Sequence, residues 1–171
     1  LALAQLADGR IIAAGYSHNG SDRDLAIACY RQDGSLDRSF GDRGVALTAI
    51  GNGHEEITAV TIGESNAITV VGSTEGTAGR ILVAARYFAN GELDSSFGEH
   101  GISLISVGDD VSAEGVAERS DGSLILSGTT LSRQKSSVLL VALDRYGALN
   151  PDIGSKGIAM AGGNFAASEG Y

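Results

Sequence analysis

Cysteine, proline and tryptophan are nearly missing from this 171-residue sequence, which has one cysteine, one proline and no tryptophan. The single Cys29 excludes an intrachain disulfide and any metal site built from several cysteines. Its apolar neighbours, from Leu25 to Tyr30, predict a buried thiol rather than a reactive one. No apolar run approaches the roughly 20 residues that span a bilayer, so we expect no membrane insertion.

Basic residues are also few, with 12 Lys and Arg against 21 Asp and Glu and a net charge of −9. Nucleic-acid binding needs clustered cations that displace counterions, so we expect no nucleic-acid partner. Docking on anionic lipid is disfavoured for the same reason. The 25 glycines beside a single proline favour many tight turns between regular elements.

No stretch has a convincing helical period, whereas short strand-like runs recur along the whole chain. Two apolar runs flank Asp8-Gly9, which is typical of a β-hairpin whose two turn residues both have positive φ. Further strand-like runs follow at 25–30 and 45–50. The same order returns twice, so each of three units is expected to contain four short strands.

The segment from Asp33 to Gly44 is repeated from Asn90 to Gly101, and a degenerate (worn) third copy runs from Tyr146 to Gly157. Glycines at three repeat positions keep a spacing of 57 and then 56 residues: Gly15, Gly72 and Gly128; Gly34, Gly91 and Gly147; Gly44, Gly101 and Gly157. Because three separate landmarks share one period, the repeat is not an accident of composition.

A four-stranded unit that recurs every 50-odd residues is typical of a β-propeller blade. We therefore predict an all-β fold with β-propeller-type repeats, in three blades of four antiparallel strands. The chain is one repeat domain, 1–171, with units at roughly 1–57, 58–114 and 115–171, circularly shifted relative to the blades. An all-β sandwich is the alternative, but it gives no reason for a strict repeat.

A family resemblance follows from two segments, Asp8-Gly9-Arg10-Ile11-Ile12-Ala13-Ala14-Gly15 and Asp33-Gly34-Ser35-Leu36-Asp37-Arg38-Ser39-Phe40-Gly41-Asp42-Arg43-Gly44. Together they resemble the bacterial delta-60 repeat, and the resemblance covers essentially the whole chain in three copies. It implies propeller-like domains in a secreted, periplasmic or cell-surface bacterial protein, and it implies no chemistry. The third copy departs at Asn150, Asp152 and Ile153, where a different local turn is expected.

Propellers close with roughly four to eight blades, so three blades make only a partial ring. Because residue 1 is leucine, we expect the chain to be a piece of a longer protein with further blades. The alternative is self-association, in which two copies complete six blades.

The repeated segment contains acids and a serine at fixed spacing, but a structural role is favoured for them. Asp37 and Asp94 are expected to accept hydrogen bonds from backbone N–H groups two or three residues on. Phe40 and Phe97 are expected to lie as apolar plugs between blades. A calcium loop would need several oxygens converging within one turn, whereas these acids alternate with apolar residues.

The residue before the last glycine of each copy is basic, and these three are the candidate ligand-binding residues: Arg43, His100 and Lys156. In radial repeats they would form an arc able to hold an anionic or sugar ligand. The alternative is a set of solvated loop charges offset by Asp42 and Glu99.

No catalytic residue, metal site or cofactor is predicted. The histidines His18, His54 and His100 fall at unrelated repeat positions, which disfavours a three-histidine metal site. The acidic pairs Glu55-Glu56 and Asp109-Asp110 are expected to be solvated loop tips.

These observations favour a non-enzymatic binding or scaffolding module that presents loops to a glycan or protein partner. One alternative is a polysaccharide hydrolase or lyase, which requires two carboxylates within roughly 5–10 Å of each other in one pocket. Another is a purely structural spacer without a concave site.

Overall fold

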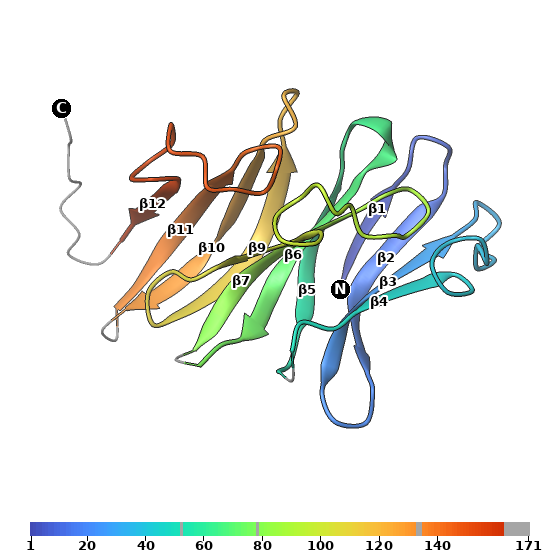
Figure 1. Cartoon of the computed structure of the whole chain (residues 1–171), viewed down its shortest axis with the longest axis horizontal. Helices are drawn as coiled ribbons and strands as arrows, with labels where there is room; N and C mark the ends of the chain where they lie inside the picture. Colours follow the sequence, from blue (N-terminus) through green and yellow to red (C-terminus); the bar gives the residue numbers. More distant parts are fainter. Residues whose placement is uncertain (52, 78, 133–134, 163–171) are drawn as a thin grey trace.

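A computed structural model of the chain describes residues 1–51, 53–77, 79–132 and 135–162. It contains three antiparallel four-stranded sheets, which stand side by side as an open fan (Figure 1). The first holds β1 (Ala2–Gln5), β2 (Ile11–His18), β3 (Arg23–Tyr30) and β4 (Val45–Thr48). The second holds β5 (Glu56–Ile62), β6 (Ile68–Glu75), β7 (Arg80–Tyr87) and β8 (Ile102–Ile105). The third holds β9 (Asp110–Glu118), β10 (Leu124–Ser132), β11 (Lys135–Leu143) and β12 (Ile158–Ala161).

The predicted fold class is confirmed, because three repeats form three sheets of four antiparallel strands, here called blades 1 to 3. Two strands begin ahead of the expected repeat boundaries at 58 and 115: β5 at Glu56 and β9 at Asp110. In the described ranges the helical structure is a short 3-10 turn, η1 (Glu64–Asn66). No helix there has the length and apolar character needed to cross a membrane.

The hairpin between β1 and β2 forms at the predicted place, but its turn differs from the expected one. Only Gly9 has positive φ, at +88°, and Asp8 does not. The Gly9 N–H donates to the Leu6 carbonyl, and the Leu6 N–H donates to the Arg10 carbonyl. This pattern is a type I turn followed by a left-handed glycine, in which a single positive φ is enough.

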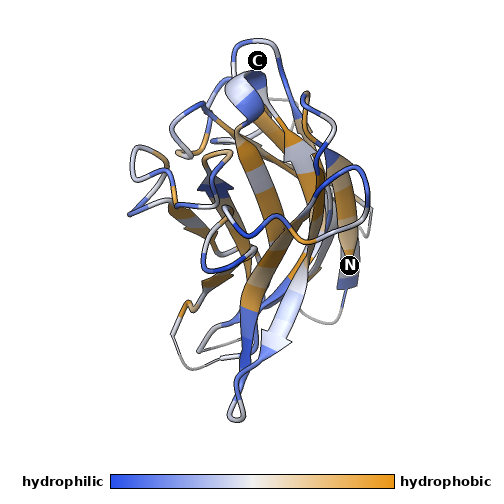
Figure 2. Cartoon of the chain, turned by 90° about the vertical axis from the view of Figure 1, so that its right-hand side faces the viewer, coloured by the Kyte–Doolittle hydropathy of each residue, from blue (hydrophilic) through white to orange (hydrophobic). Residues whose placement is uncertain are grey.

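The core lies between the blades, because each sheet alternates its side chains between two faces. In blade 2, Val70 packs with the residues of blade 1, whereas its neighbour Val71 packs with those of blade 3. Hydrophobic residues accordingly concentrate on the strands, and the connecting loops are hydrophilic (Figure 2). Cys29 is fully buried in the core between blades 1 and 2, as predicted.

The repeated segment forms the same turn in all three blades. In blade 1 the Asp37 N–H donates to the Cys29 carbonyl, and the Phe40 N–H donates to the Asp37 carbonyl. In blade 3 the Asn150 N–H donates to the Ala142 carbonyl, and the Ile153 N–H donates to the Asn150 carbonyl. The expectation of a different turn in the worn copy is therefore wrong. Asparagine supplies the same backbone groups, and its side-chain oxygen accepts the Asp152 N–H as an aspartate would.

This turn also joins each blade to the next through what we call the blade-junction contact. The Gly41 N–H of blade 1 donates to the Asn90 carbonyl of blade 2 at 2.8 Å, and the Gly98 N–H of blade 2 donates to the Tyr146 carbonyl of blade 3 at 2.7 Å. The residue after each carbonyl is a glycine that packs on the plug: a Cβ at Gly91 would lie 2.9 Å from the Phe40 ring.

Both plug rings are fully buried. The second junction repeats the first in this respect also, since a Cβ at Gly147 would lie 3.0 Å from the Phe97 ring. The predicted plugs between blades are therefore present at both internal junctions, and each needs a bare glycine above it.

We expect Gly91→Ala to destabilise the protein by about 1–3 kcal/mol more than Gly122→Ala, because its new methyl group overpacks the junction. The two glycines have similar strain, with φ of +88° and +80°. A Cβ at Gly122 meets only the Arg145 Cβ at 3.4 Å, which is an ordinary contact. The free energies of unfolding in urea measure the difference, and equal losses would show that the junction tolerates a side chain.

Candidate functional site

The three predicted ligand-binding residues occupy equivalent places, one in each blade. Arg43, His100 and Lys156 have φ of +52°, +54° and +55°, and all three are exposed. The glycine after each one donates its N–H to the carbonyl of the residue at the plug position, as Gly44 does to Phe40. The side chains thus project from one kind of turn, and the assignment of a ligand to them stays a prediction.

A concave hollow recurs at both internal blade junctions. Hollow 1, with a volume of about 680 Å³, lies between blades 2 and 3. Its lining residues are Ala49, Ile50, Gly98, Glu99, His100, Ile102, Ser103, Leu104, Ile105, Ser106, Gly147, Ala148 and Leu149. Hollow 2, of about 410 Å³, lies between blades 1 and 2. Its lining residues are Gly41, Asp42, Val45, Ala46, Leu47, Thr48, Tyr87, Gly91 and Leu93.

The two hollows are built from the same repeat positions. Gly41, Asp42 and Leu47 of hollow 2 correspond to Gly98, Glu99 and Leu104 of hollow 1, each 57 residues later. On the far wall, Gly91 and Leu93 correspond to Gly147 and Leu149, each 56 residues later. The blade-junction contact therefore generates a hollow wherever it occurs.

Hollow 2 has an aromatic lining residue that hollow 1 lacks at the equivalent position. In hollow 2 the Tyr87 ring fills the space beside β4, and its hydroxyl lies 2.7 Å from the Thr48 hydroxyl. Burial raises the pKa of Tyr87 to about 12. Leu143 stands at the equivalent position in blade 3. It is fully buried and is not among the lining residues of hollow 1.

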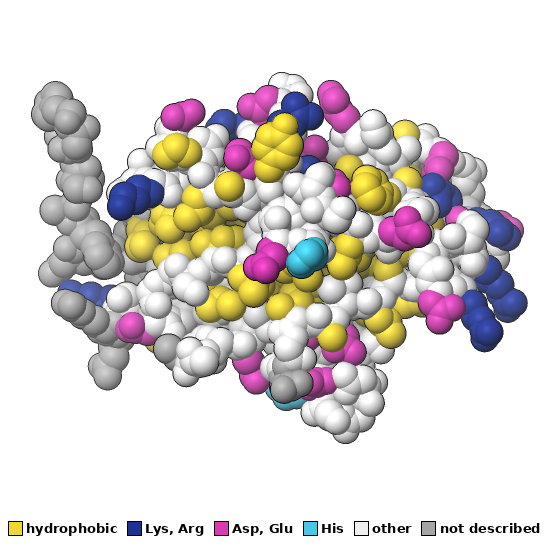
Figure 3. Space-filling model, viewed as in Figure 1, with side chains coloured by type: hydrophobic (Ala, Val, Ile, Leu, Met, Phe, Trp, Pro, Cys, Tyr) yellow, Lys and Arg dark blue, Asp and Glu magenta, His cyan; other side chains and the backbone are white. Residues whose placement is uncertain are grey.

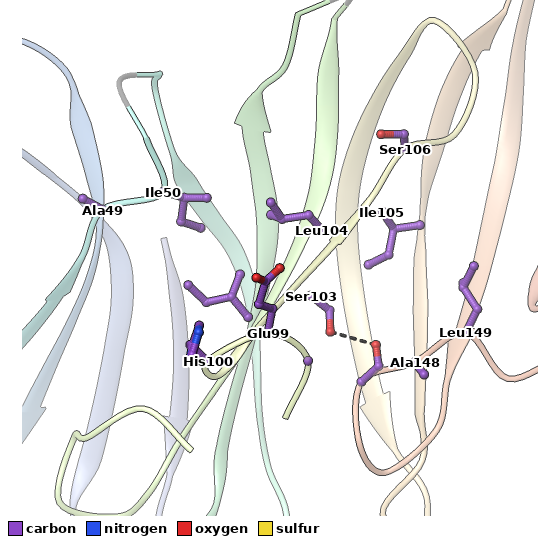
Figure 4. Close-up of a pocket in the computed structure, with 13 residues that line it drawn as sticks. Ala49, Ile50, Glu99, His100, Ser103, Leu104, Ile105, Ser106, Ala148 and Leu149 are labelled. Carbon is purple, nitrogen blue, oxygen red and sulfur yellow. Dashed lines mark hydrogen bonds between the residues drawn. The ribbon is translucent and has the colours of Figure 1, made fainter. Parts of the chain in front are cut away.

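Residues from two neighbouring blades line hollow 1 (Figure 4). Glu99 and His100 come from the turn of blade 2, whereas Ala148 and Leu149 come from blade 3. The Ser103 hydroxyl donates to the Gly147 carbonyl at 2.7 Å, which links blade 2 to blade 3 at the hollow. Of the three predicted residues, His100 lines a hollow, whereas Arg43 and Lys156 are not among the lining residues of either one. The structure does not bring the three together in one cavity.

Hollow 1 also runs along a free strand edge. β8 is the last strand of its sheet and pairs only with β7. The Arg86 N–H donates to the Gly101 carbonyl, and hydrogen-bonded pairs alternate along an antiparallel ladder. The backbone N–H and C=O of Leu104 therefore point away from β7. The Leu104 side chain is 51% exposed, and hydrophobic side chains lie open on the face shown in Figure 3.

The aspartate of the repeated segment has a structural environment. Asp37 is only 5% exposed, and its Oδ1 accepts the Ser39 hydroxyl at 2.8 Å and the Ser39 N–H at 3.3 Å. The Arg10 and Arg31 guanidinium groups lie 3.3 Å from its two oxygens. The hydrogen bonds from Ser39, assisted by Arg10 and Arg31, hold the pKa of Asp37 below its usual value. A carboxylate so fully engaged is a poor acid or base catalyst.

An arginine reaches across each junction, but from a different strand. In blade 1, Arg10 Nη1 donates to the Ala89 carbonyl at 3.2 Å. In blade 2, Arg86 Nη1 donates to the equivalent Arg145 carbonyl at 2.7 Å, and its guanidinium lies 4.4 Å from the centre of the Phe97 ring. Partial burial lowers the pKa of Arg86. These arginines support the junctions rather than a ligand site.

Glu55 corrects one sequence-based expectation, because it is fully buried and not a solvated loop tip. Its Oε1 accepts the Thr74 hydroxyl at 2.9 Å, and its N–H donates to the Arg23 carbonyl. Burial raises the pKa of Glu55. Within the described ranges, no three His, Cys, Asp or Glu side chains are arranged to hold a metal ion.

Residues 6–40 match a family model described as a domain of unknown function (DUF5122) β-propeller. The matched part of the first repeat is similar to this β-propeller family, which is delta-60-repeat-like. The match covers β2, β3 and the turn up to the plug Phe40, and it confirms the family resemblance of the sequence. No curated protein matches the chain.

Asp37→Asn tests the charge of the delta-60 turn aspartate while keeping the turn, since Asn150 holds the same turn in blade 3. We expect a loss of about 1 kcal/mol at pH 7, because the ion pairs with Arg10 and Arg31 disappear. The folded-state pKa is lowered, so this stabilisation is present above the unfolded value of about 3.9 and is lost as the pH falls through the folded value.

Denaturant unfolding of both proteins at pH 7 and at about pH 2 gives the measurement. The matched control is Asp94→Asn, whose carboxylate accepts hydrogen bonds from Ser96 but makes no ion pair with the described residues. We expect the control to lose less stability at pH 7. A loss at Asp37 that stays the same at both pH values would contradict the electrostatic account.

Proposed function

We propose that the chain is a non-enzymatic binding module that holds an extended peptide segment in hollow 1. The observation that carries the proposal is the coincidence of a repeated junction hollow with a free strand edge. A peptide beside Leu104 can pair its backbone with the outward N–H and C=O groups of β8, while its side chains enter the hollow. The hollow then makes apolar contacts with the peptide side chains, and the edge of β8 sets the direction of the peptide chain.

The lining of hollow 1 favours a peptide over a glycan. Its side walls are aliphatic, with Ile50, Ile102 and Leu104 on blades 1 and 2 and Leu149 on blade 3. No Trp, Tyr or Phe ring is among its lining residues, so hollow 1 lacks the large rings with an apolar face and a polar edge that Trp and Tyr provide. Glu99 at the rim and the net charge of −9 favour a peptide that carries a basic residue.

The two alternative functions have less support. A polysaccharide hydrolase needs two converging carboxylates, whereas each hollow has one carboxylate among its lining residues, Glu99 or Asp42. A pure spacer needs no concave site, so a hollow that recurs at both junctions argues against it. An exported bacterial setting, which the delta-60 resemblance implies, agrees with a binding module.

The proposal is tested by amide chemical shifts of the isotope-labelled chain during titration with a blocked peptide that alternates valine with threonine and ends in lysine. We expect saturable shifts centred on Leu104 and Ser106, with a dissociation constant of roughly 0.1–1 mM, because the contact area is small. Leu104→Arg should weaken binding at least about tenfold, because it places a cation at the apolar wall.

Leu131→Arg is the matched control, since Leu131 is an exposed leucine outside both hollows. It should leave the peptide affinity unchanged. Cellohexaose is titrated in parallel. Shifts at hollow 1 with cellohexaose but not with the peptide would replace the peptide by a glycan, and no shifts with either would favour the spacer.

A further inference from the structure

Each blade-junction contact consists of two half-sites, one on each blade. The first half-site is the plug residue with the glycine N–H that follows it, as in Phe40 and Gly41. The second is the carbonyl and glycine of the next blade's turn, as in Asn90 and Gly91. Every blade carries both half-sites, because both belong to the repeated segment. Within the described chain, one half-site of blade 1 and one of blade 3 have no counterpart.

On blade 1 the open half-site is the turn of Asp33 and Gly34. Gly34 has φ of +82°, close to the +88° of Gly91, so the turn already has its junction shape. A Cβ at Gly34 would meet nothing within 4 Å, whereas one at Gly91 meets the plug. The neighbouring apolar face is open as well, since Leu3 is 74% exposed.

On blade 3 the open half-site is Ile153 with the Gly154 N–H, which has no partner among the described residues. The apolar sheet face beside it is exposed. Val138 is 62% exposed, whereas Leu25 and Leu82, at the same repeat position in blades 1 and 2, are each 1% exposed under the following blade. Among the described residues, blades 1 and 2 are each followed by another blade, whereas blade 3 is not.

We infer that two copies of this chain pair head to tail, so that blade 3 of each copy receives the Asp33-Gly34 turn of the other. The occupant is a second copy because the two open half-sites are the complementary halves of a contact that the chain already makes twice. A head-to-tail contact made twice around a two-fold axis closes on itself. Six blades result, a number within the range at which propellers close.

The end face of blade 3 indicates that this pairing is reversible. Ser127 is exposed there, whereas Ala14 and Val71 are the buried residues at the same repeat position. Ile153 is also smaller than the phenylalanine plugs of the internal junctions. With these polar and smaller residues, a junction between two copies would bury less apolar area than an internal junction does. Free chains and pairs should therefore exchange. The inference concerns the two ends of the arc and does not depend on a ligand in hollow 1.

Sedimentation velocity of the 171-residue chain over a concentration series tests the pairing. We expect a concentration-dependent shift from the mass of one chain to the mass of two. Gly34→Asn should raise the dissociation constant at least about tenfold, because its side chain would lie against the plug of the other copy. Asparagine tolerates positive φ, and the free turn has room for it, so the chain should fold.

Gly20→Asn is the matched control, with φ of +103°, open space around it and a place in the loop between β2 and β3, away from the half-sites. It should pair as the original chain does. Val138→Lys is a second variant, which replaces an exposed residue of the single chain and should also prevent pairing.

Circular dichroism at low concentration verifies that both variants are folded. A chain that stays a monomer up to about 1 mM would overturn the inference, and so would a dimer that survives both Gly34→Asn and Val138→Lys. Masses that climb beyond two chains would overturn the closed ring, because head-to-tail pairing would then continue without closure.

Discussion

The hydrogen bond from the glycine after each plug to the carbonyl of the next blade is the contact on which the arrangement depends. It spans 2.8 Å at Asn90 and 2.7 Å at Tyr146, and it holds a bare glycine against a fully buried ring. A lone four-stranded sheet leaves apolar faces open to water. This contact fixes the distance at which the next sheet covers one of them, and both the cores and the hollows follow from that distance.

The repeat made the fold predictable from the sequence, because glycine landmarks report backbone positions that no other residue can occupy. Gly72 and Gly128 are examples, since a Cβ there would collide with the backbone of the neighbouring strand. The plugs could be predicted for the same reason. The burial of Glu55 could not, because it depends on Thr74 in another strand. Hollow 1 was also beyond prediction, since Leu104 and Leu149 come from blades 2 and 3 and Ile50 comes from the segment between β4 and β5.

Comparison of the blades shows which features the repeat fixes and which it leaves free. The carbonyl at Ala89 and its equivalent at Arg145 both accept a guanidinium, yet Arg10 comes from the start of β2 and Arg86 from β7. The repeated backbone therefore places a carbonyl at each junction that accepts a hydrogen bond, and arginines from different parts of the blade donate it. The hollows vary in the same way, because the frame fixes their position while their volumes differ, at about 680 and 410 Å³.

An array of this kind gains stability from each blade and from each junction between neighbours. Blade 2 has two junctions, whereas blades 1 and 3 have one each within the described chain. The end blades should consequently open first. Gly154 is exposed, so water can accept the hydrogen bond from its N–H while no blade covers it. The pairing inferred above would add one junction to each end blade and would so stabilise the least stable part of the array.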